Sequence, residues 1–419
     1  MSGPSSHIPI IFVHGDSDTA AHWIAQFWRF RQAGWPASHL LAADFPHPGA
    51  PLDDGVAEEN RSTTTELALQ LRDLVARLTA ETGFDKIALI GSSRGCNTIR
   101  NYLRNFGGAP HVETVILCGG VHHGVMVNPN GSLGSEFNGA GHFLSGLNMG
   151  LEVMEGVGTV TIRSDKFDLY NQPMGDWIGL PDIPVGGHPD GAALDGAENL
   201  VIPGADHREV AFSETAFAMM IKVLTGRTGL PTPIMPEPVP VLNGKVTGWA
   251  NDRPTNLPLT GARLRIYATD PADGERQGDA VHEATIGADG YWGPFAAIAG
   301  QTYEFEVTAE GYPVHHIYRS AFARSFDYLN LRLYPSLAEE NEMAVVNMMR
   351  PRGYFGTRRD TIELGGETAP GIADTAVPGI WQTHVPALAG TTVTGRFNGE
   401  VIVARAWPAD HTVWIELTH

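Results

Sequence analysis

The pentapeptide Gly91-Ser92-Ser93-Arg94-Gly95 is the sequence feature that most restricts how this chain can fold. It follows the apolar run IALI, which predicts a buried strand, and it opens residues 94–106, whose apolar positions recur on one stripe of a helix. A serine between two glycines at such a turn is typical of a nucleophile elbow, in which the hydroxyl projects at the carboxyl edge of a sheet. The alternative is an ordinary Gly/Ser turn. The flanking strand and helix, more than the pentapeptide itself, therefore predict that Ser93 is a nucleophile.

Apolar runs alternate with helical patterns over residues 1–230. The runs are unbroken, as expected for strands of a parallel sheet that is covered on both faces, and strand–helix–strand order implies right-handed crossovers. The expected helices span residues 64–82 and 94–106 and a segment capped by Ser213, and the expected strands span residues 8–13, 87–90, 115–117, 160–163 and 200–202. This part of the chain is thus predicted to be an α/β domain with a doubly wound parallel sheet.

A chain of 419 residues is expected to form more than one domain. Five prolines between residues 231 and 242 predict an extended, semi-rigid linker. Beyond it, short strand-like runs separated by turn residues predict an all-β sandwich or barrel over residues 243–336, with a further β region packing with it over residues 337–419. Within the first domain, residues 124–158 fit the alternation poorly, and we expect either a surface excursion or a mobile lid over an apolar pocket.

His207 is the histidine expected to activate the serine, because a hydroxyl is a poor nucleophile until a base removes its proton. Among 17 histidines, His207 lies directly after the last expected strand and before the last helix, where this topology places the base. His122 and His123 follow another strand and are expected at the same sheet edge, in pocket or supporting roles. Because their spacing completes no metal site and no acidic cluster has convincing calcium-ligand spacing, we expect no metal and no cofactor.

The carboxylate that orients His207 is expected between the serine and the histidine, after another strand. The segment TVTIRSDKFDLYNQP offers Asp165 and Asp168, and these residues alone do not separate the two, although an aspartate after a strand is often a turn cap. Four more aspartates lie in a loop rich in Pro and Gly and are expected to be solvated or turn residues: Asp176, Asp182, Asp190 and Asp195.

His14 and Gly15 end the first expected strand, in IIFVHGDSD. The main-chain N–H groups of Asp16, after this His-Gly pair, and of Arg94, after the serine, are the natural pair of donors for an oxyanion hole. The alternative for His14 and Gly15 is a simple strand-end turn.

These residues resemble the lipases and esterases of the α/β-hydrolase superfamily over roughly residues 7–226. FVHG resembles their oxyanion motif, GSSRG their lipase box and PGADH their histidine loop. DLYNQP resembles the segment that follows the catalytic acid in several lipases, which favours Asp168, with Asp165 as the alternative. The resemblance implies a carboxylic ester hydrolase with a Ser-His-Asp triad and an acyl-enzyme intermediate. Arginine after the serine is a departure, since lipases often have a small or apolar residue there.

The second half resembles a transthyretin-like or carboxypeptidase-regulatory β-sandwich. The combination is similar to a lipase subfamily in which a C-terminal β domain helps engage lipid, so we expect possible lipid-interface contact there; a stabilising appendage is the alternative. Trp292, Tyr303 and Trp381 are candidates to contact a substrate if they are exposed, although most strand aromatics are core residues.

Composition narrows the partners. A net charge of -19 argues against nucleic acid and against an anionic membrane surface. We expect no transmembrane segment, and no signal peptide is visible, so a cytoplasmic protein and a secreted one whose signal has been removed both stay open. The expected substrate is a small-molecule or lipid ester. The alternatives are a polyester of the polyhydroxyalkanoate type, a thioester or an amide cleaved by the same triad, and, more remotely, non-catalytic binding of lipid or glycan.

Overall fold

The computed structural model describes residues 7–335 and 344–419. The chain divides into two compact units, Met1–Pro233 with Arg253–Thr255, and Ile234–Asp252 with Asn256–His419. The division falls inside the proline-rich stretch 231–242. Residues 337–343 of the predicted final β region lie outside the described residues.

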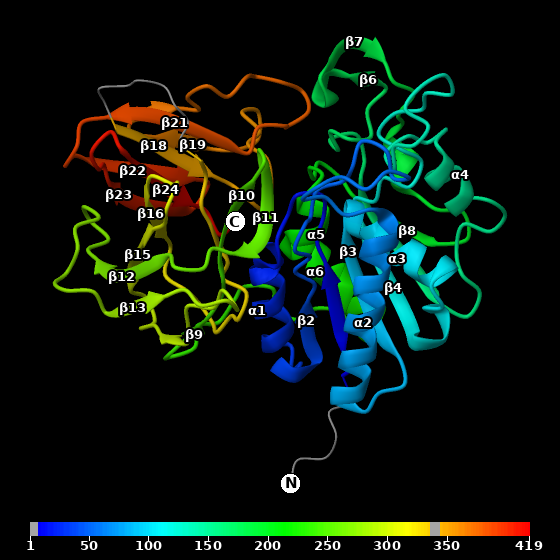
Figure 1. Cartoon of the computed structure of the whole chain (residues 1–419), viewed down its shortest axis with the longest axis horizontal. Coiled ribbons are helices and arrows are strands. Elements are labelled where there is room, and N and C mark those ends of the chain that lie inside the picture. Colours follow the sequence, from blue (N-terminus) through cyan, green and yellow to red (C-terminus); the bar gives the residue numbers. More distant parts are fainter. Residues whose placement is uncertain (1–6, 336–343) are drawn as a thin grey trace. The chain divides into compact units, whose positions relative to one another are not determined.

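Six parallel strands form the central sheet of the first unit, in the order β2-β1-β3-β4-β5-β8 (Figure 1). Their bounds are Ile10–Val13 (β1), Leu40–Ala42 (β2), Ile87–Ser92 (β3), Val112–Cys118 (β4), Gly158–Ser164 (β5) and Glu198–Ile202 (β8). The predicted α/β fold with a parallel sheet is therefore confirmed. The sequence analysis missed β2, because three residues are too few to show a strand period.

Helices cover both faces of this sheet, and the side chains of β1 show how. Ile11 and Val13 are buried in a core shared with α2 and α3. Phe12 points to the opposite face, where its ring lies 5.5 Å from that of Phe30 in α1, and Phe30 packs edge-on against Phe217 of α6 at 5.2 Å. Burial on both faces explains why the strand sequences are apolar without alternation. The helices are Ile24–Gln32 (α1), Thr64–Thr82 (α2), Arg94–Asn105 (α3), His142–Leu147 (α4), Glu209–Phe212 (α5) and Glu214–Thr225 (α6).

Two long connections leave the carboxyl edge of the sheet. The one between β4 and β5 contains α4 and corresponds to the predicted excursion or lid; Leu144 and Leu147 of α4 are buried, and so are the polar side chains of Glu136 and Asn138. The one between β5 and β8 contains a small antiparallel hairpin of β6 (Met174–Gly175) and β7 (Leu180–Pro184). Whether the first of these moves as a lid stays a prediction.

The second unit is built from β-strands, as predicted. Its largest sheet has seven strands in the order β13-β12-β15-β16-β24-β18-β21, and a second sheet has the order β20-β19-β22-β23. The large sheet draws strands from both predicted β regions. The strands of the second half are Val241–Leu242 (β9), Val246–Ala250 (β10), Arg253–Pro258 (β11), Arg263–Thr269 (β12), His282–Thr285 (β13), Phe295–Ala296 (β14), Thr302–Thr308 (β15), Val314–Arg319 (β16), Leu331–Arg332 (β17), Ala344–Met349 (β18), Ile362–Leu364 (β19), Glu367–Thr368 (β20), Gln382–Ala387 (β21), Thr392–Phe397 (β22), Glu400–Arg405 (β23) and His411–Glu416 (β24).

Two of the aromatic residues proposed to contact substrate are core residues instead. Trp292 and Tyr303 are each only 2% exposed. The indole N–H of Trp292 donates to the carbonyl oxygen of Leu329, and the Tyr303 hydroxyl accepts from the Ile298 N–H, so the polar tip of each ring is satisfied inside the unit. An aromatic ring buries a large apolar area, so a core position stabilises the fold more than an exposed one does. Trp381 is partly exposed.

Gly95 determines how closely α3 approaches β1. A Cβ atom at Gly95 would collide with the carbonyl oxygens of Val13 and His14, which are main-chain atoms that cannot move aside alone. The start of α3 therefore sits against the end of β1 only because this position has no side chain.

We expect Gly95→Ala to destabilise the folded chain by about 1–3 kcal/mol, the usual cost of overpacking, and to separate α3 from β1. Gly146→Ala is the matched control, because Gly146 lies inside α4 and a Cβ there meets no atom within 4 Å; alanine should be neutral or slightly stabilising at that position. Thermal unfolding of the two variants and the wild type measures the difference. Equal melting temperatures for both variants would contradict the steric argument.

Candidate active site

Ser93 forms a strained turn between β3 and α3. Its φ is 54° and its ψ is -124°, a conformation that costs non-glycine residues on the order of 1–3 kcal/mol. The Ser93 N–H donates to the carbonyl oxygen of Cys118 at the end of β4, at 2.9 Å. A Cβ at Gly91 would lie 3.0 Å from the main-chain atoms Cys96 N and Gly95 C, so the first glycine of the pentapeptide also lets the start of α3 pack closely. The strained strand-to-helix turn expected from the sequence is present, and the Ser93 side chain is partly exposed.

Asp168 and His207 lie in direct contact at the same edge of the sheet. Both carboxylate oxygens of Asp168 are 2.9 Å from His207 Nδ1. The carboxylate also accepts from the main-chain N–H of Tyr170 at 2.9 Å and from the side chain of Asn171 at 3.0 Å. Asp168 and His207 are buried, and the Tyr170 ring packs edge-on against the imidazole at 4.6 Å. A carboxylate held this firmly at Nδ1 leaves Nε2 as the nitrogen that can exchange a proton.

The other ring nitrogen of His207 is available. Nε2 is buried and has no hydrogen-bond partner among the residues that the structure describes. The imidazole lies beside Gly119, where a Cβ would be 3.3 Å from His207 Nδ1. Gly119 directly follows Cys118, the acceptor of the Ser93 N–H. The serine turn and the histidine therefore both lie against the end of β4.

Asp165 has a different partner set from Asp168. Its Oδ1 accepts from the main-chain N–H groups of Lys166 at 2.7 Å and Gly204 at 3.2 Å, which makes it a turn cap that joins the ends of β5 and β8. Burial alone would raise the pKa of Asp165, but these hydrogen bonds outweigh it and hold the pKa below its ordinary value. In the described parts of the chain, no hydrogen bond or ion pair joins His207 to Asp165 or to the four loop aspartates Asp176, Asp182, Asp190 and Asp195.

His14 orients the peptide that follows it. His14 Nδ1 lies 2.8 Å from the carbonyl oxygen of Gly15, and its Nε2 accepts from the Phe45 N–H at 3.3 Å, so Nδ1 carries the proton. The Gly15 carbonyl belongs to the same peptide plane as the Asp16 N–H, one of the two expected oxyanion donors. A Cβ at Gly15 would be 3.1 Å from Ser93 Cβ, which places this strand end against the serine. No acceptor for the N–H of Asp16 or of Arg94 is found within residues 7–335 and 344–419.

His122 and His123 lie near the sheet edge, and no hydrogen bond joins either of them to Asp168 or His207 among the described residues. His122 is fully buried; its Nδ1 is 3.1 Å from Asn97 Oδ1, and its Nε2 has no partner within the described chain. Burial, reinforced by the positive charge of Arg100, holds the pKa of His122 well below its ordinary value. His123 bonds to Glu152 at 2.8 Å and to the Gly191 carbonyl at 3.0 Å. Both histidines thus support loops.

Three residues that the sequence did not mark support this site. Tyr170, through its main-chain N–H, and Asn171, through its side chain, donate to the Asp168 carboxylate. Their place in DLYNQP is the signal that could have found them, because an aspartate side chain at a turn often bonds to groups two or three residues further along the chain. Glu136 pairs with the side chain of Arg94, the residue after the serine. Nothing in the sequence pattern marks Glu136, since it lies 42 residues from Arg94, in an irregular segment that follows β4.

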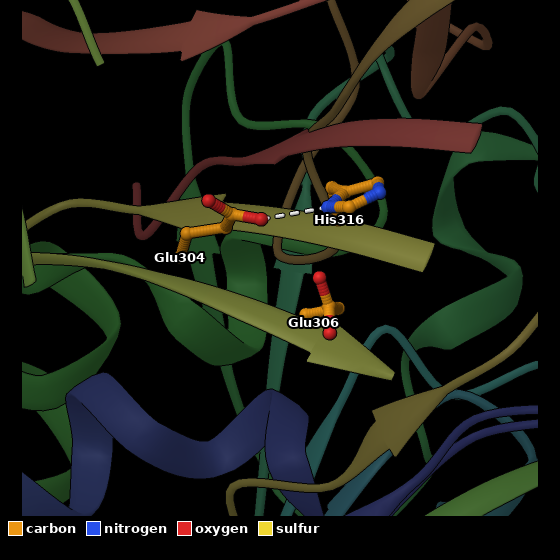
Figure 2. Close-up of side chains that lie close together, drawn as sticks. All are labelled: Glu304, Glu306 and His316. Atoms are coloured by element: carbon orange, nitrogen blue, oxygen red, sulfur yellow. Dashed lines mark hydrogen bonds and ion pairs between the residues drawn. The ribbon is translucent and has the colours of Figure 1, made fainter. Parts of the chain in front are cut away.

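Glu304, Glu306 and His316 of the second unit form a cluster that could hold a metal ion by its donor atoms alone, which all lie within 4.8 Å of one another (Figure 2). The side chains are already bonded to protein groups. Arg276 donates to Glu304 at 2.6 and 2.8 Å and to Glu306 at 2.7 Å. His316 bonds to Glu304 at 2.6 Å and to His411 at 2.8 Å. The guanidinium of Arg276 thus supplies the positive charge that this cluster needs.

Two protein families match the chain. Residues 7–134 match the family described as Lipase (class 2), and residues 241–335 match the family described as Lipase C-terminal domain. The first unit thus contains a region similar to class 2 lipases, and the second unit contains a region similar to the C-terminal domain of lipases. The match to class 2 lipases supports a hydrolase that acts on esters.

Solved structures similar to this chain are distant from it in sequence. Bacillus licheniformis lipase BlEst2 in its mature form is 18% identical, with a TM-score of 0.38, and the match covers 54% of this chain and 95% of that one. The propeptide form of the same lipase is 14% identical, with a TM-score of 0.40, over 96% and 94% of the two chains. Aspergillus fumigatus lipase B is 18% identical, with a TM-score of 0.38, and the match spans 54% of either chain. No curated protein matches the sequence. Among residues 7–335 and 344–419, no helix is long and apolar enough to cross a membrane.

We expect acid to destabilise the first unit through His122. The unfolded chain binds a proton at this residue near pH 6.5, whereas the buried ring does not, so stability falls as the pH drops below that value. The loss of stability therefore grows as the pH falls from 7.5 to 5. His122→Asn keeps a donor for Asn97 and removes the titration, so its melting temperature should fall less between pH 7.5 and pH 5 than that of the wild type. His142→Asn, at an exposed position, is the control. An unchanged pH dependence in the His122 variant would overturn the assignment.

Proposed function

We propose that the first unit hydrolyses carboxylic esters with Ser93 as nucleophile, His207 as base and Asp168 as the acid that orients the base. The observation that carries the proposal is the state of the His207 ring, which is bound at Nδ1 by a buried carboxylate and open at Nε2. The strained turn at Ser93 supports it, because a conformation that costs free energy persists where the surrounding fold requires it.

Each residue then has one task in a two-step reaction. His207 Nε2 takes the proton of Ser93 Oγ as the oxygen attacks the ester carbonyl, and it gives that proton to the departing alcohol. Water, activated by the same nitrogen, then hydrolyses the acyl-enzyme and frees the acid. Asp168 keeps the proton on Nδ1 and stabilises the imidazolium that forms during each step.

The oxyanion that develops in both steps needs hydrogen-bond donors. The N–H groups of Asp16 and Arg94 are proposed for this task, because both belong to residues beside Ser93 and both lack an acceptor within the described residues. Arg94 is also the first residue of α3, whose N-terminal end favours negative charge. One such donor contributes about 10²–10³ in turnover.

The proposed substrate is a carboxylic ester, and within that class a lipid ester. We further predict that the C-terminal domain contacts a lipid interface. A polyester, a thioester or an amide would use the same three residues. Turnover on p-nitrophenyl esters of increasing chain length, on triglyceride emulsions and on polyester films would rank these alternatives. Non-catalytic binding of lipid or glycan predicts no turnover on any of them.

We expect Ser93→Ala to abolish ester hydrolysis while the chain stays folded, because alanine removes the attacking oxygen and fits where serine fits. A fluorophosphonate probe should label the wild-type chain at Ser93 and leave the variant unlabelled. Ser92→Ala, the neighbouring buried serine, is the matched control and should retain both activity and labelling. Full esterase activity in the Ser93 variant would rule out the proposed mechanism.

We expect Asp168→Asn to lower kcat by about 10³–10⁴ with little change in KM, because an amide cannot hold the required tautomer of His207. Asp165→Asn changes the same atoms three residues earlier, at the turn cap. It should lower the melting temperature and leave kcat within about threefold, since this partly exposed cap makes no hydrogen bond to the histidine. If the Asp165 variant lost activity and the Asp168 variant kept it, the two roles would have to be exchanged.

A further inference from the structure

Arg94 has a second feature, separate from its main chain. Its side chain is 1% exposed and reaches three other segments near the serine. Nη1 donates to the Pro48 carbonyl at 2.8 Å, and Nη2 donates to the Ser62 carbonyl at 2.5 Å. Nε donates to both carboxylate oxygens of Glu136, at 3.0 and 2.9 Å, and Nη2 donates to one of them again at 2.5 Å. Such a forked pair fixes direction as well as distance.

The pair is costly to bury and therefore calls for an explanation. Glu136 is also 1% exposed, so neither charge is solvated. Burial alone would lower the pKa of Arg94, but the Glu136 carboxylate outweighs it and holds the pKa above its ordinary value. Buried pairs of this kind are often no more stabilising than apolar side chains of the same size. A contribution to stability thus does not by itself explain why the residue after the serine forms a buried ion pair with Glu136.

The hydrogen bonds of Arg94 converge on the loop that carries the other oxyanion donor. The Pro48 carbonyl that accepts from Arg94 also accepts from the Ser17 N–H at 3.1 Å. Ser17 follows Asp16 and has a φ of 58°, so a left-handed residue flanks each donor: Ser93 before the Arg94 N–H and Ser17 after the Asp16 N–H. Arg94 Nη1 is in addition 3.6 Å from Asp16 Oδ1. One guanidinium therefore ties both strained turns together.

We propose that the Arg94–Glu136 pair positions the oxyanion hole: the pair holds the main-chain N–H groups of Arg94 and Asp16 at the separation that the tetrahedral oxyanion needs. Glu136 is then a positioning residue for catalysis. The proposal rests on the proposed function, and it adds that the segment between β4 and β5 controls turnover through Glu136 without touching the substrate. A displacement of about 1 Å in such a site can cost on the order of 10² in rate.

The first test replaces the carboxylate by its isosteric amide. Glu136→Gln keeps the shape and one acceptor for Nε but removes the charge that directs the fork. We expect kcat on p-nitrophenyl butyrate to fall about 10- to 100-fold, with KM within about threefold, because the loss falls on the transition state. The rate at which a fluorophosphonate labels Ser93 should fall in parallel. Glu214→Gln, which removes the partner of the buried Arg29 at an ion pair of 3.7 Å, should leave kcat unchanged.

A second variant separates positioning from folding. Arg94→Met with Glu136→Leu replaces the pair by apolar side chains of similar size, which should restore much of the stability lost in the single variant. If the pair positions the donors, the double variant melts near the wild-type temperature and is still slow. If it recovers both the melting temperature and kcat, the pair serves packing alone and the proposal is overturned.

The outcomes also separate this proposal from the proposed function. If the wild-type chain hydrolyses the ester, Ser93→Ala abolishes the activity and Glu136→Gln does not change it, then the positioning role is overturned and the proposed ester hydrolase is supported. Wild-type chain that hydrolyses no ester and takes up no fluorophosphonate overturns the proposed function, and the positioning role with it.

Discussion

The contact between the start of α3 and the end of β1 is the constraint on which the site depends. The absence of a side chain at Gly95 lets the helix begin against the carbonyl oxygens of Val13 and His14. That approach puts the residue before the helix, Ser93, into a left-handed turn, and the hydrogen bond from its N–H to Cys118 secures the turn against β4. Three neighbouring strands of one parallel sheet thereby determine where the serine oxygen can be.

Because all six strands are parallel, their carboxyl ends meet at one edge, and residues far apart in the chain are brought together there. Asp168 follows β5 and His207 follows β8, and these two strands are neighbours in the sheet, which is why their side chains touch. Asp165 follows β5 more closely, and its carboxylate already accepts a hydrogen bond from the Gly204 N–H, which joins the two strand ends. The extra residues between the strand and Asp168 are what lets the second aspartate reach the imidazole.

The features that the sequence predicts are those that depend on near neighbours in the chain. The run IALI, the two glycines and the helical stripe after them are local, so the strand, the strained turn and α3 could all be inferred before the structure. His207 could be located because a strand and a helix flank it. Glu136 could not, since its contact with Arg94 is made by an irregular segment whose path depends on its buried polar groups and on no repeating pattern. The choice of Asp168 over Asp165 rested on a resemblance, and the structure adds a physical difference, namely which carboxylate the main chain has already occupied.

In the second half of the chain, too, the sequence predicts the local strands but not which distant strands pair. The sequence suggested a sandwich over residues 243–336 and a further β region after it, but β24, the last strand, pairs in parallel with β16 on one side and β18 on the other. Without β24, the strands of the first region and those of the second would share no hydrogen bonds in the large sheet. Pairings this distant in sequence are slow to form, because loop closure has to precede them. The two regions are therefore completed together, by the final strand, and residues near the C-terminus such as Trp414 and Ile415 belong to the core of the whole sheet.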